Sequence, residues 1–201
     1  VGTNKGDSTF FERGMYDRAG GGYYCGVPLH NAIFTSQSDP NTQYQMPADY
    51  TVNNGLLIDS QVTSGSLTLK NPTTVTNLSI LGTGGGGGCN VSYTVNHQDG
   101  ITFEYGSFNP GDWFNGANPA WICGGRVGTP GGGYGAIDTT GTSAGGASGA
   151  NPRMYTYKIT VSSASPVTSI AFTYGSDGGH DCFFALIGNA AGSQSCPIAI
   201  S

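Results

Sequence analysis

The chain has 201 residues, of which 35 are glycine, and charged residues make up only 9% of it. Such high glycine and low charge exclude a coiled coil or a long-helix protein, and 37% hydrophobic residues are enough for a packed core rather than charge-driven disorder. The net charge of −5 and the scattered basic residues disfavour nucleic acid as a partner, and no apolar run is long enough for a membrane span.

Alternating apolar and polar residues predict a series of short β-strands. In chain order these strands cover residues 32–36, 55–59, 66–71, 74–81, 89–95, 101–105, 153–161, 168–174 and 182–187. Asp99-Gly100 lies between two of them and predicts a hairpin, because glycine accepts the positive φ of the turn. Within the strand 74–81, the alternation places Asn77 on the wetter side.

These strands predict an all-β fold, a two-sheet antiparallel β-sandwich of the jelly-roll or Greek-key kind with glycine-rich loops. Residues 27–188 form the sandwich domain, between an N-terminal extension (1–26) and a C-terminal tail (189–201). Three regions are predicted to lack strands: 1–26, the connection 106–151 and the tail after Gly188. The exception is segment 8–17, which could form a strand with no local partner and be donated to a neighbouring molecule.

Five cysteines are candidates for disulfides: Cys25, Cys89, Cys123, Cys182 and Cys196. They form no C-x-x-C pair and no zinc-finger spacing, so we expect bridges made in an oxidising compartment rather than a metal site. Cys182–Cys196 and Cys89–Cys123 are two conceivable pairs, but the spacing does not decide the connectivity. The odd cysteine is left as a thiol or as a bridge between chains. With a start at Val1 rather than Met, these features predict a secreted, extracellular or cell-surface protein.

Two glycine motifs resemble enzyme signatures. Gly82–Gly87 fits G-x-G-x-x-G, but a strand follows it, so no helix N-terminus is available for a pyrophosphate, and a glycine hairpin is expected. Gly141–Gly145 fits G-x-S-x-G but lies in a run of small residues without a following helix. Neither motif supports catalysis, and no cofactor is expected.

Acidic and histidine side chains are the remaining candidates for catalysis or metal binding. No spacing forces two of the later carboxylates together as a glycosidase requires; they are Glu104, Asp112, Asp138, Asp177 and Asp181. Glu104 alternates with Phe103 and Tyr105 and is expected on the wet face of a strand. His30, His97 and His180 would form a trio only if the fold gathered them. We therefore predict no catalytic residue, no metal ligand and no enzyme activity.

The two tryptophans lie in the long connection among polar residues. Aromatic faces stack on sugar rings while amide and carboxylate groups bond the hydroxyls, so a carbohydrate-binding set is proposed from Asp112, Trp113, Asn115, Asn118 and Trp121. The alternative is that Trp113 and the adjacent phenylalanine cap one end of the sandwich. Two N-x-S sequons make Asn77 and Asn90 candidate glycosylation sites.

Several segments together resemble a known group of proteins: residues 55–58, 65–69, 77–81, 91–100, 112–119, 151–155, 167–174 and 179–180. Their order resembles secreted bacterial β-sandwich domains similar to galactose-binding-like or carbohydrate-binding modules, over about residues 27–188. The resemblance implies the sandwich fold and export, and it carries over no catalytic residue. The N-terminal extension, the cysteines and the glycine-rich inserts depart from the pattern.

Two hypotheses for function follow. In the first, which we prefer because a low-charge surface suits contact between copies, the protein is a non-catalytic extracellular structural subunit. Copies of it self-assemble into a filament, sheath or surface matrix, with the N-terminal segment added to a neighbour's sheet edge. In the second, it is a carbohydrate-binding module or lectin-like domain that recognises a neutral polysaccharide.

Overall fold

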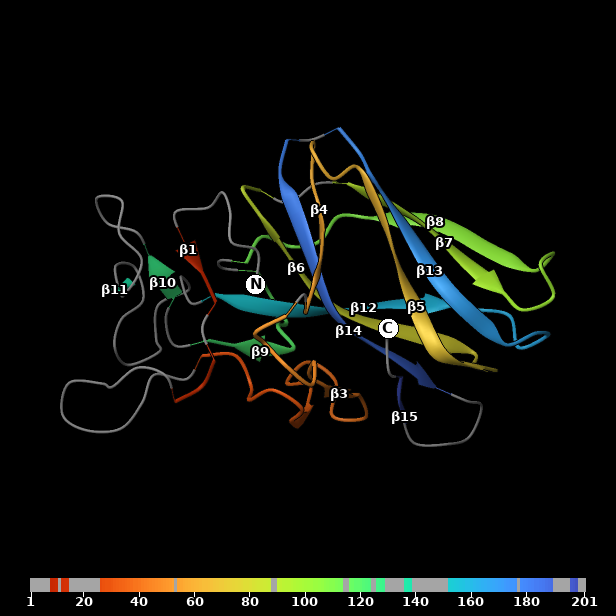
Figure 1. The fold of residues 1–201 in the computed structure, drawn as a ribbon, viewed down its shortest axis with the longest axis horizontal. Coiled ribbons are helices and arrows are strands. Elements are labelled where there is room, and N and C mark those ends of the chain that lie inside the picture. Colours follow the sequence, from red (N-terminus) through yellow and green to blue (C-terminus); the bar gives the residue numbers. More distant parts are fainter. Residues whose placement is uncertain are drawn as a thin grey trace.

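The structure, a computed structural model, describes residues 8–10, 12–14, 26–52, 54–87, 90–113, 116–123, 126–128, 136–138, 152–176, 178–189 and 196–198. All regular secondary structure in these ranges is β-strand, and every pair of neighbouring strands is antiparallel (Figure 1). The predicted all-β class is confirmed. Across the same ranges there is no helix of the length and apolarity needed to cross a membrane.

Two antiparallel sheets form the body of the sandwich. The larger sheet contains, in order, β15 (Cys196–Ile198), β14 (His180–Asn189), β6 (Asn77–Gly85), β12 (Arg153–Thr160) and β9 (Trp121–Ile122), and β4 (Leu56–Ile58) also pairs with β14. The smaller sheet contains β5 (Ser64–Thr73), β13 (Val167–Tyr174), β7 (Val91–His97) and β8 (Phe103–Phe108). The smaller sheet lies on the right in Figure 1.

Two small units complete the described structure. A hairpin joins β2 (Ile33–Thr35) to β3 (Gln43–Gln45), and a three-stranded unit contains β1 (Ser8–Thr9), β10 (Arg126–Gly128) and β11 (Ala136–Asp138). All nine predicted strands are present, and β1 lies in segment 8–17, which was named as a possible strand. The strands β3, β9, β10, β11 and β15 were missed. Each missed strand has two or three residues, too few for alternation alone to mark it, whereas β2 and β4, also of three residues, lie within longer predicted runs.

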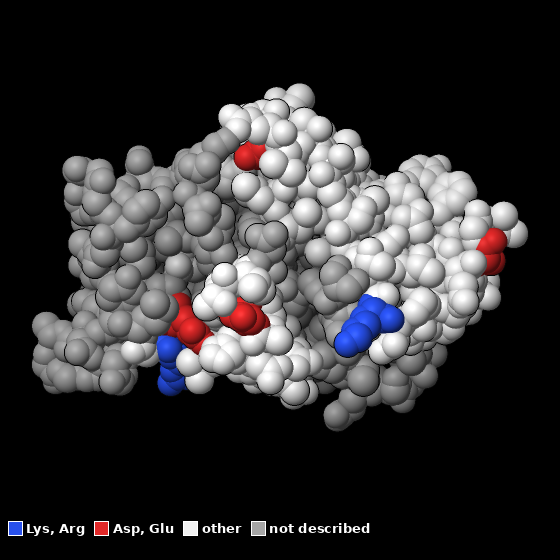
Figure 2. All heavy atoms as spheres, viewed as in Figure 1, with Lys and Arg blue, Asp and Glu red and all other residues white. Residues whose placement is uncertain are grey.

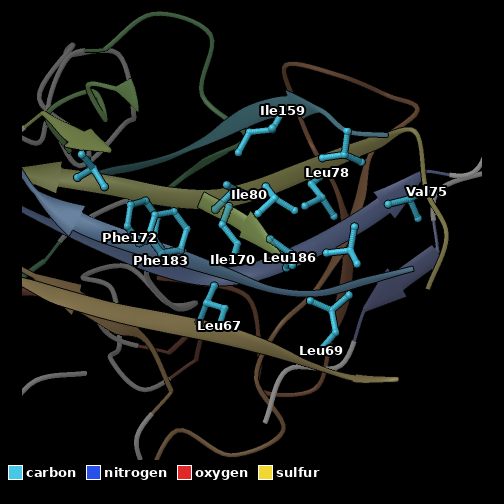
Figure 3. Close-up of a cluster of buried hydrophobic side chains, with 14 of the residues drawn as sticks. Leu67, Leu69, Val75, Leu78, Ile80, Ile159, Ile170, Phe172, Phe183 and Leu186 are labelled. Atoms are coloured by element: carbon cyan, nitrogen blue, oxygen red, sulfur yellow. The ribbon is translucent and has the colours of Figure 1, made fainter. Parts of the chain in front are cut away.

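The first hydrophobic core lies between the two sheets (Figure 3). The smaller sheet contributes alternate residues such as Leu67, Ile170 and Phe172, and the larger sheet contributes residues such as Ile80 and Phe183. The rings of Phe172 and Phe183 stack with centroids 4.3 Å apart and planes inclined by 17°. Each fully buried side chain of this kind stabilises the fold by roughly 1.5–3 kcal/mol.

A second core covers the opposite face of the larger sheet. It combines residues of the larger sheet with the N-terminal segment and the β2–β3 hairpin: Phe10, Val27, Phe34, Tyr44, Met46, Leu81, Ala120, Cys123, Met154, Phe184, Ala185 and Ile187. Because both faces of β6 and β14 are covered, these strands are buried almost without interruption, at eight of the nine residues of β6 and at all but Cys182 between Asp181 and Gly188. A bulge in β14 between Phe183 and Ala185 turns Phe184 and Ala185 together toward this core.

The second core changes the predicted sides of β6. Asn77 is half-buried at the start of the strand, but Ser79 and Leu81, which share its face, are 1% and 0% exposed. The expectation of a wetter side on this strand is therefore wrong beyond its first residue. The physical reason is the second core: the N-terminal segment and the β2–β3 hairpin cover a face of β6 that a two-layer sandwich would leave in water.

The glycine run that ends β6 is not a hairpin. The neighbours of β6 are β14 and β12, whereas β7 belongs to the other sheet, so the connection after β6 crosses between sheets. Gly86 and Gly87 have φ of +66° and +95°, a conformation that glycine adopts without strain. Within the strand, a Cβ on Gly82 would lie only 2.6 Å from Cδ1 of Phe183, so this glycine permits the close approach of the ring.

The Asp99-Gly100 hairpin is confirmed. β7 and β8 pair without a register shift from Val91↔Phe108 to Asn96↔Phe103, and Gly100 in the turn has φ of +71°. Both side-chain oxygens of Asp99 accept hydrogen bonds within the turn, one from the backbone N–H groups of Ile101 and Thr102 and the other from the Thr102 hydroxyl. The carboxylate thus satisfies the turn's own donors.

The N-terminal segment packs on its own chain. Ser8–Thr9 pairs with β10, Phe10 is buried in the second core, and Glu12 forms a parallel bridge with Val27. The sequence predicted no local partner for this segment, and the partner is indeed distant in sequence. Donation of the segment to a second copy stays a prediction.

Candidate functional site

The outer face of the smaller sheet carries a regular array of uncharged side chains, and Lys70 is the next outward residue along β5 beyond it. Strand register places them in three rows across β8, β7, β13 and β5: Phe103–Asn96–Ser169–Thr68, Tyr105–Thr94–Ala171–Ser66 and Ser107–Ser92–Thr173–Ser64. Every one of these positions is exposed or half-buried, whereas the core-facing Val95, Leu67, Ile170 and Phe172 are buried. We call these twelve residues the outer face.

Hydroxyl and amide groups dominate the outer face, and none of its side chains is ionisable at neutral pH. The Asn96 amide donates to the Ser169 hydroxyl at 3.1 Å, which orients both groups. Figure 2 shows few charged side chains on the side of the molecule in view, and some of them lie close together at the lower left. The outer face therefore offers uncharged hydrogen-bond donors and acceptors, as the low charge of the composition suggests.

Two aromatic rings stand at the β8 end of the outer face. Phe103 and Tyr105 are 58% and 77% exposed, and their ring centroids lie 6.2 Å apart with planes inclined by 34°. Ile101, in the preceding turn, is 80% exposed. Exposed apolar side chains that gather in this way commonly mark a binding surface.

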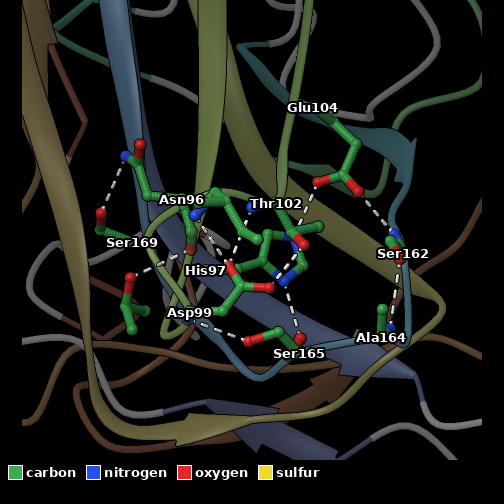
Figure 4. Close-up of polar contacts among 11 residues, drawn as sticks. Asn96, His97, Asp99, Thr102, Glu104, Ser162, Ala164, Ser165 and Ser169 are labelled. Atoms are coloured by element: carbon green, nitrogen blue, oxygen red, sulfur yellow. Dashed lines mark hydrogen bonds and ion pairs between the residues drawn. The ribbon is translucent and has the colours of Figure 1, made fainter.

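The rings face outward because Glu104, between them in sequence, is held inward by hydrogen bonds (Figure 4). Its Oε2 lies 2.8 Å from Nε2 of His97, and its Oε1 accepts the backbone N–H of Ser162 at 2.6 Å. Nδ1 of His97 lies 2.7 Å from the carbonyl oxygen of Ser165. The arrangement ties the β7–β8 hairpin to the loop between β12 and β13.

Both ring nitrogens of His97 therefore face acceptors, and only the doubly protonated imidazolium donates to both. Burial of the ring lowers the pKa of His97, but the hydrogen bonds to Glu104 and Ser165 and the charges of Glu104 and Asp99 raise it by more, to above 6.5. The His97 side chain is fully buried. With both nitrogens engaged and no exposure, this ring is arranged to hold the hairpin rather than to exchange a proton with a substrate.

The expected orientation of β8 is thus wrong, although its period of two is right. Glu104 points inward and Phe103 and Tyr105 point outward. A carboxylate prefers water over an apolar core unless it is paired, and here the buried His97 ring and the backbone N–H of Ser162 provide the pairing. Ser162 and Ser165 are about sixty residues away in sequence, so no local sequence pattern predicts their contacts with Glu104 and His97.

The predicted carbohydrate set lies around the second core. Trp113 and Trp121 are half-buried and pack against that core. Phe10 meets the Trp113 ring edge to face at 5.3 Å, and Phe34 meets Trp121 at 5.2 Å. The Trp121 indole N–H donates to the carbonyl of Gly26 at 2.9 Å. The alternative that Trp113 and Phe114 cap one end of the sandwich stays a prediction, and Phe114 lies outside the described residues.

The polar members of that set are placed less uniformly. The Asp112 carboxylate accepts the backbone N–H of Gly87 at 2.8 Å, and the Asp112 carbonyl accepts the Tyr155 hydroxyl at 2.7 Å. Asn118 is exposed and has a positive φ of 54°. Asn115 lies outside the described residues. The structure brings both tryptophans to one core and leaves their role in ligand binding a prediction.

The disulfide prediction fails wherever the described residues test it. Cys123 and Cys182 are thiols rather than half-cystines. Cys196 is in register with Gly188, six residues along β14 from Cys182, and about 20 Å of strand is far beyond the roughly 7 Å that a disulfide spans between Cα atoms. Cys25, Cys89 and the Cys196 side chain lie outside the described residues. Burial raises the pKa of the Cys182 thiol to about 12, which keeps it protonated.

The other candidates are dispersed. His30 contacts Glu12 at 2.7 Å near the N-terminus, and His180 begins β14 opposite Gly85. Asp181 is buried in β14, while the Asp138 side chain, Asp177 and the Gly141–Gly145 motif lie outside the described residues. Nowhere in the described ranges do three His, Cys, Asp or Glu side chains gather as a metal would need.

The candidate glycosylation sites have different surroundings. Asn90 is exposed just before β7. Asn77 is half-buried, and its amide carbonyl accepts a hydrogen bond from the Thr160 hydroxyl at 3.3 Å. Of the two, Asn90 is the more accessible to a modifying enzyme.

Comparison with known proteins does not name a family. No family model matches the chain, and no curated protein matches it. The structure itself shows an all-β protein in which antiparallel sheets pack as a sandwich.

Proposed function

We propose that this protein is a non-catalytic module that binds a neutral polysaccharide on its outer face. The observation that carries the proposal is the pair of exposed rings, Phe103 and Tyr105, at the edge of an array of hydroxyl and amide groups without charge. The resemblance of the sequence to galactose-binding-like and carbohydrate-binding modules supports the same proposal, and an exported location belongs to it.

The chemistry of the face suits such a ligand. A sugar ring presents C–H groups that pack on an aromatic plane and hydroxyls that exchange hydrogen bonds with Asn, Ser and Thr side chains. An acidic glycan or a phosphate would require cations, and no lysine or arginine occupies the three rows. The ligand is therefore proposed to be uncharged.

The test is retention on a panel of immobilised neutral polysaccharides. The double variant Phe103→Ala/Tyr105→Ala is expected to reduce affinity at least about tenfold, since two stacking contacts contribute more than the ~1.4 kcal/mol that tenfold represents. Ile101→Ala is the matched control, because it removes an exposed apolar side chain of the same hairpin that lies outside the rows.

The outcomes separate the two candidate sites. Loss of retention in Trp113→Ala with unchanged retention in the Phe103/Tyr105 variant would move the site to the second core. No retention of the unaltered protein on any neutral glycan would refute the proposal.

A structural subunit that self-assembles is the second candidate. One observation favours it: Ile101, Phe103 and Tyr105 gather on a single hairpin at the edge of a sheet, where a second copy could cover them. Electron microscopy of concentrated protein tests it, with filaments or sheets expected. Uniformly dispersed single particles under all assembly conditions would contradict it.

A further inference from the structure

The two edges of the smaller sheet differ in their protection against pairing. Exposed edge strands usually carry lysine, proline or a bulge that blocks the addition of another strand. β5, at one edge, contains Lys70 and Pro72, and its pairing with β13 has a register shift between Val167 and Ser169. This edge has all three protective features.

β8, at the other edge, has none of these features. Its six residues, Phe103–Phe108, include no lysine and no proline, and its register with β7 is unbroken. Among the residues that the structure describes, β7 is the one strand that pairs with β8. A regular strand that pairs on one side only, as β8 does in the described part of the chain, is a template for another strand.

The charges around β8 also permit a second copy. Glu104 is the one ionisable acid of the strand, and its carboxylate is turned inward onto His97 and the Ser162 N–H. The neighbouring outward side chains are Phe103, Tyr105 and Ser107, which are uncharged. Two copies that met edge to edge would therefore bring no like charges from β8 together.

We propose that two copies of this protein pair through β8, strand to antiparallel strand, about a two-fold axis. An antiparallel pair of identical strands is self-complementary, so one open edge suffices for both copies. The pairing joins two four-stranded sheets into one of eight strands and places the Phe103 and Tyr105 rings of both copies on one continuous surface. It requires no glycan, and it closes at two copies, so a filament would need an additional contact.

The first test places a charge on the proposed contact. Ser107→Lys adds an exposed lysine to β8 without removing either ring, and Ser66→Lys is the matched control on the same face at the opposite edge. Sedimentation velocity is expected to show dimers for the unaltered protein and for Ser66→Lys, and monomers for Ser107→Lys. Circular dichroism checks that both variants keep the β fold.

The second test measures proximity directly. With a bifunctional thiol cross-linker of about 15 Å, Ser107→Cys is expected to give a 107–107 bridge identifiable by peptide mapping. Ser66→Cys is expected to give none, because seven inter-strand spacings, about 33 Å, separate the two Ser66 positions in the joined sheet. A monomeric unaltered protein at its highest soluble concentration would overturn the proposal. Dimers that persist in Ser107→Lys and lack the 107–107 bridge would also overturn it, because the copies would then meet elsewhere.

These outcomes are distinguishable from those for glycan binding. Sedimentation of the unaltered protein without glycan reports the dimer and its retention on polysaccharide reports the binding site, whereas Ser107→Lys is scored for sedimentation alone because Ser107 lies on the outer face. Loss of dimers thus leaves the binding proposal intact, and loss of glycan retention leaves the dimer intact.

Discussion

Nε2 of His97 and Oε2 of Glu104 lie 2.8 Å apart on the core-facing side of the smaller sheet, whose other side is exposed. The two residues are seven positions apart in sequence and face each other across the β7–β8 hairpin. The contact holds Glu104 inward and so turns Phe103 and Tyr105 outward. The surface we propose for binding is therefore supported from beneath by this hydrogen-bonded pair.

The stability provided by His97 is expected to depend on pH. The pKa of His97 in the folded protein is raised above 6.5, so its contribution is fully present below about pH 6.5 and is lost as the pH rises through the folded pKa. Thermal unfolding from about pH 5 to about pH 9 measures it. The difference in melting temperature between the unaltered protein and His97→Gln is expected to shrink as the pH rises across this range. A constant difference would contradict the stabilising role of protonated His97.

Removal of the Glu104 charge is expected to destabilise the fold. Glu104→Gln leaves a buried imidazolium without its counter-charge and is expected to cost about 1.5–3 kcal/mol in urea unfolding. It should also lower the pKa of His97, measured by NMR titration of the ring. Glu12→Gln is the control, because the Glu12–His30 pair is similarly close but His30 is 57% exposed, and such pairs contribute about 0–1 kcal/mol. Equal effects of the two substitutions would refute the distinction.

A methyl group at Gly82 is expected to strain the core. Its Cβ would lie 2.6 Å from Cδ1 of Phe183 and 3.0 Å from the Cys182 carbonyl oxygen, so Gly82→Ala is expected to cost about 1–3 kcal/mol of unfolding free energy. At Gly111, the nearest atom to an added Cβ would be Cε2 of Tyr155 at 3.4 Å. Gly111→Ala should therefore cost much less, and the reverse order would count against this packing.

The thiol of Cys182 is expected to be unreactive in the folded protein. Its pKa of about 12 leaves almost no thiolate at about pH 8, so iodoacetamide should label it only after unfolding. Mass spectrometry of labelled native and denatured protein measures this. Peptide mapping without reductant should also find no Cys182–Cys196 bridge, and detection of that bridge would show a different pairing of β14 and β15.

Trp121 is expected to act on stability rather than on glycan retention. Trp121→Phe removes the N–H that donates to Gly26 and is expected to cost about 0.5–1.5 kcal/mol, measured by chemical unfolding. Retention on neutral polysaccharide should be unchanged. If Trp121→Phe kept normal stability but lost retention, Trp121 would belong to the binding site.

Much of the fold follows from local patterns. Period-two alternation located the long strands, and Asp99-Gly100 located the hairpin, because both signals come from residues adjacent in the chain. The candidate site could not be predicted from such local patterns. Phe103 and Tyr105 are apolar, and an alternating pattern by itself assigns such residues to the core.

The amino-acid sequence by itself determined the β class, the position of the long strands and the low charge of the surface, since these depend on composition and on side chains two residues apart. Only the tertiary structure decided which face of each strand is buried. The layer formed by Phe10, Phe34 and Tyr44 covers a face of β6, and His97 with the Ser162 N–H turns Glu104 inward. Both outcomes depend on groups brought together from distant parts of the chain, and burial is a property of those neighbours.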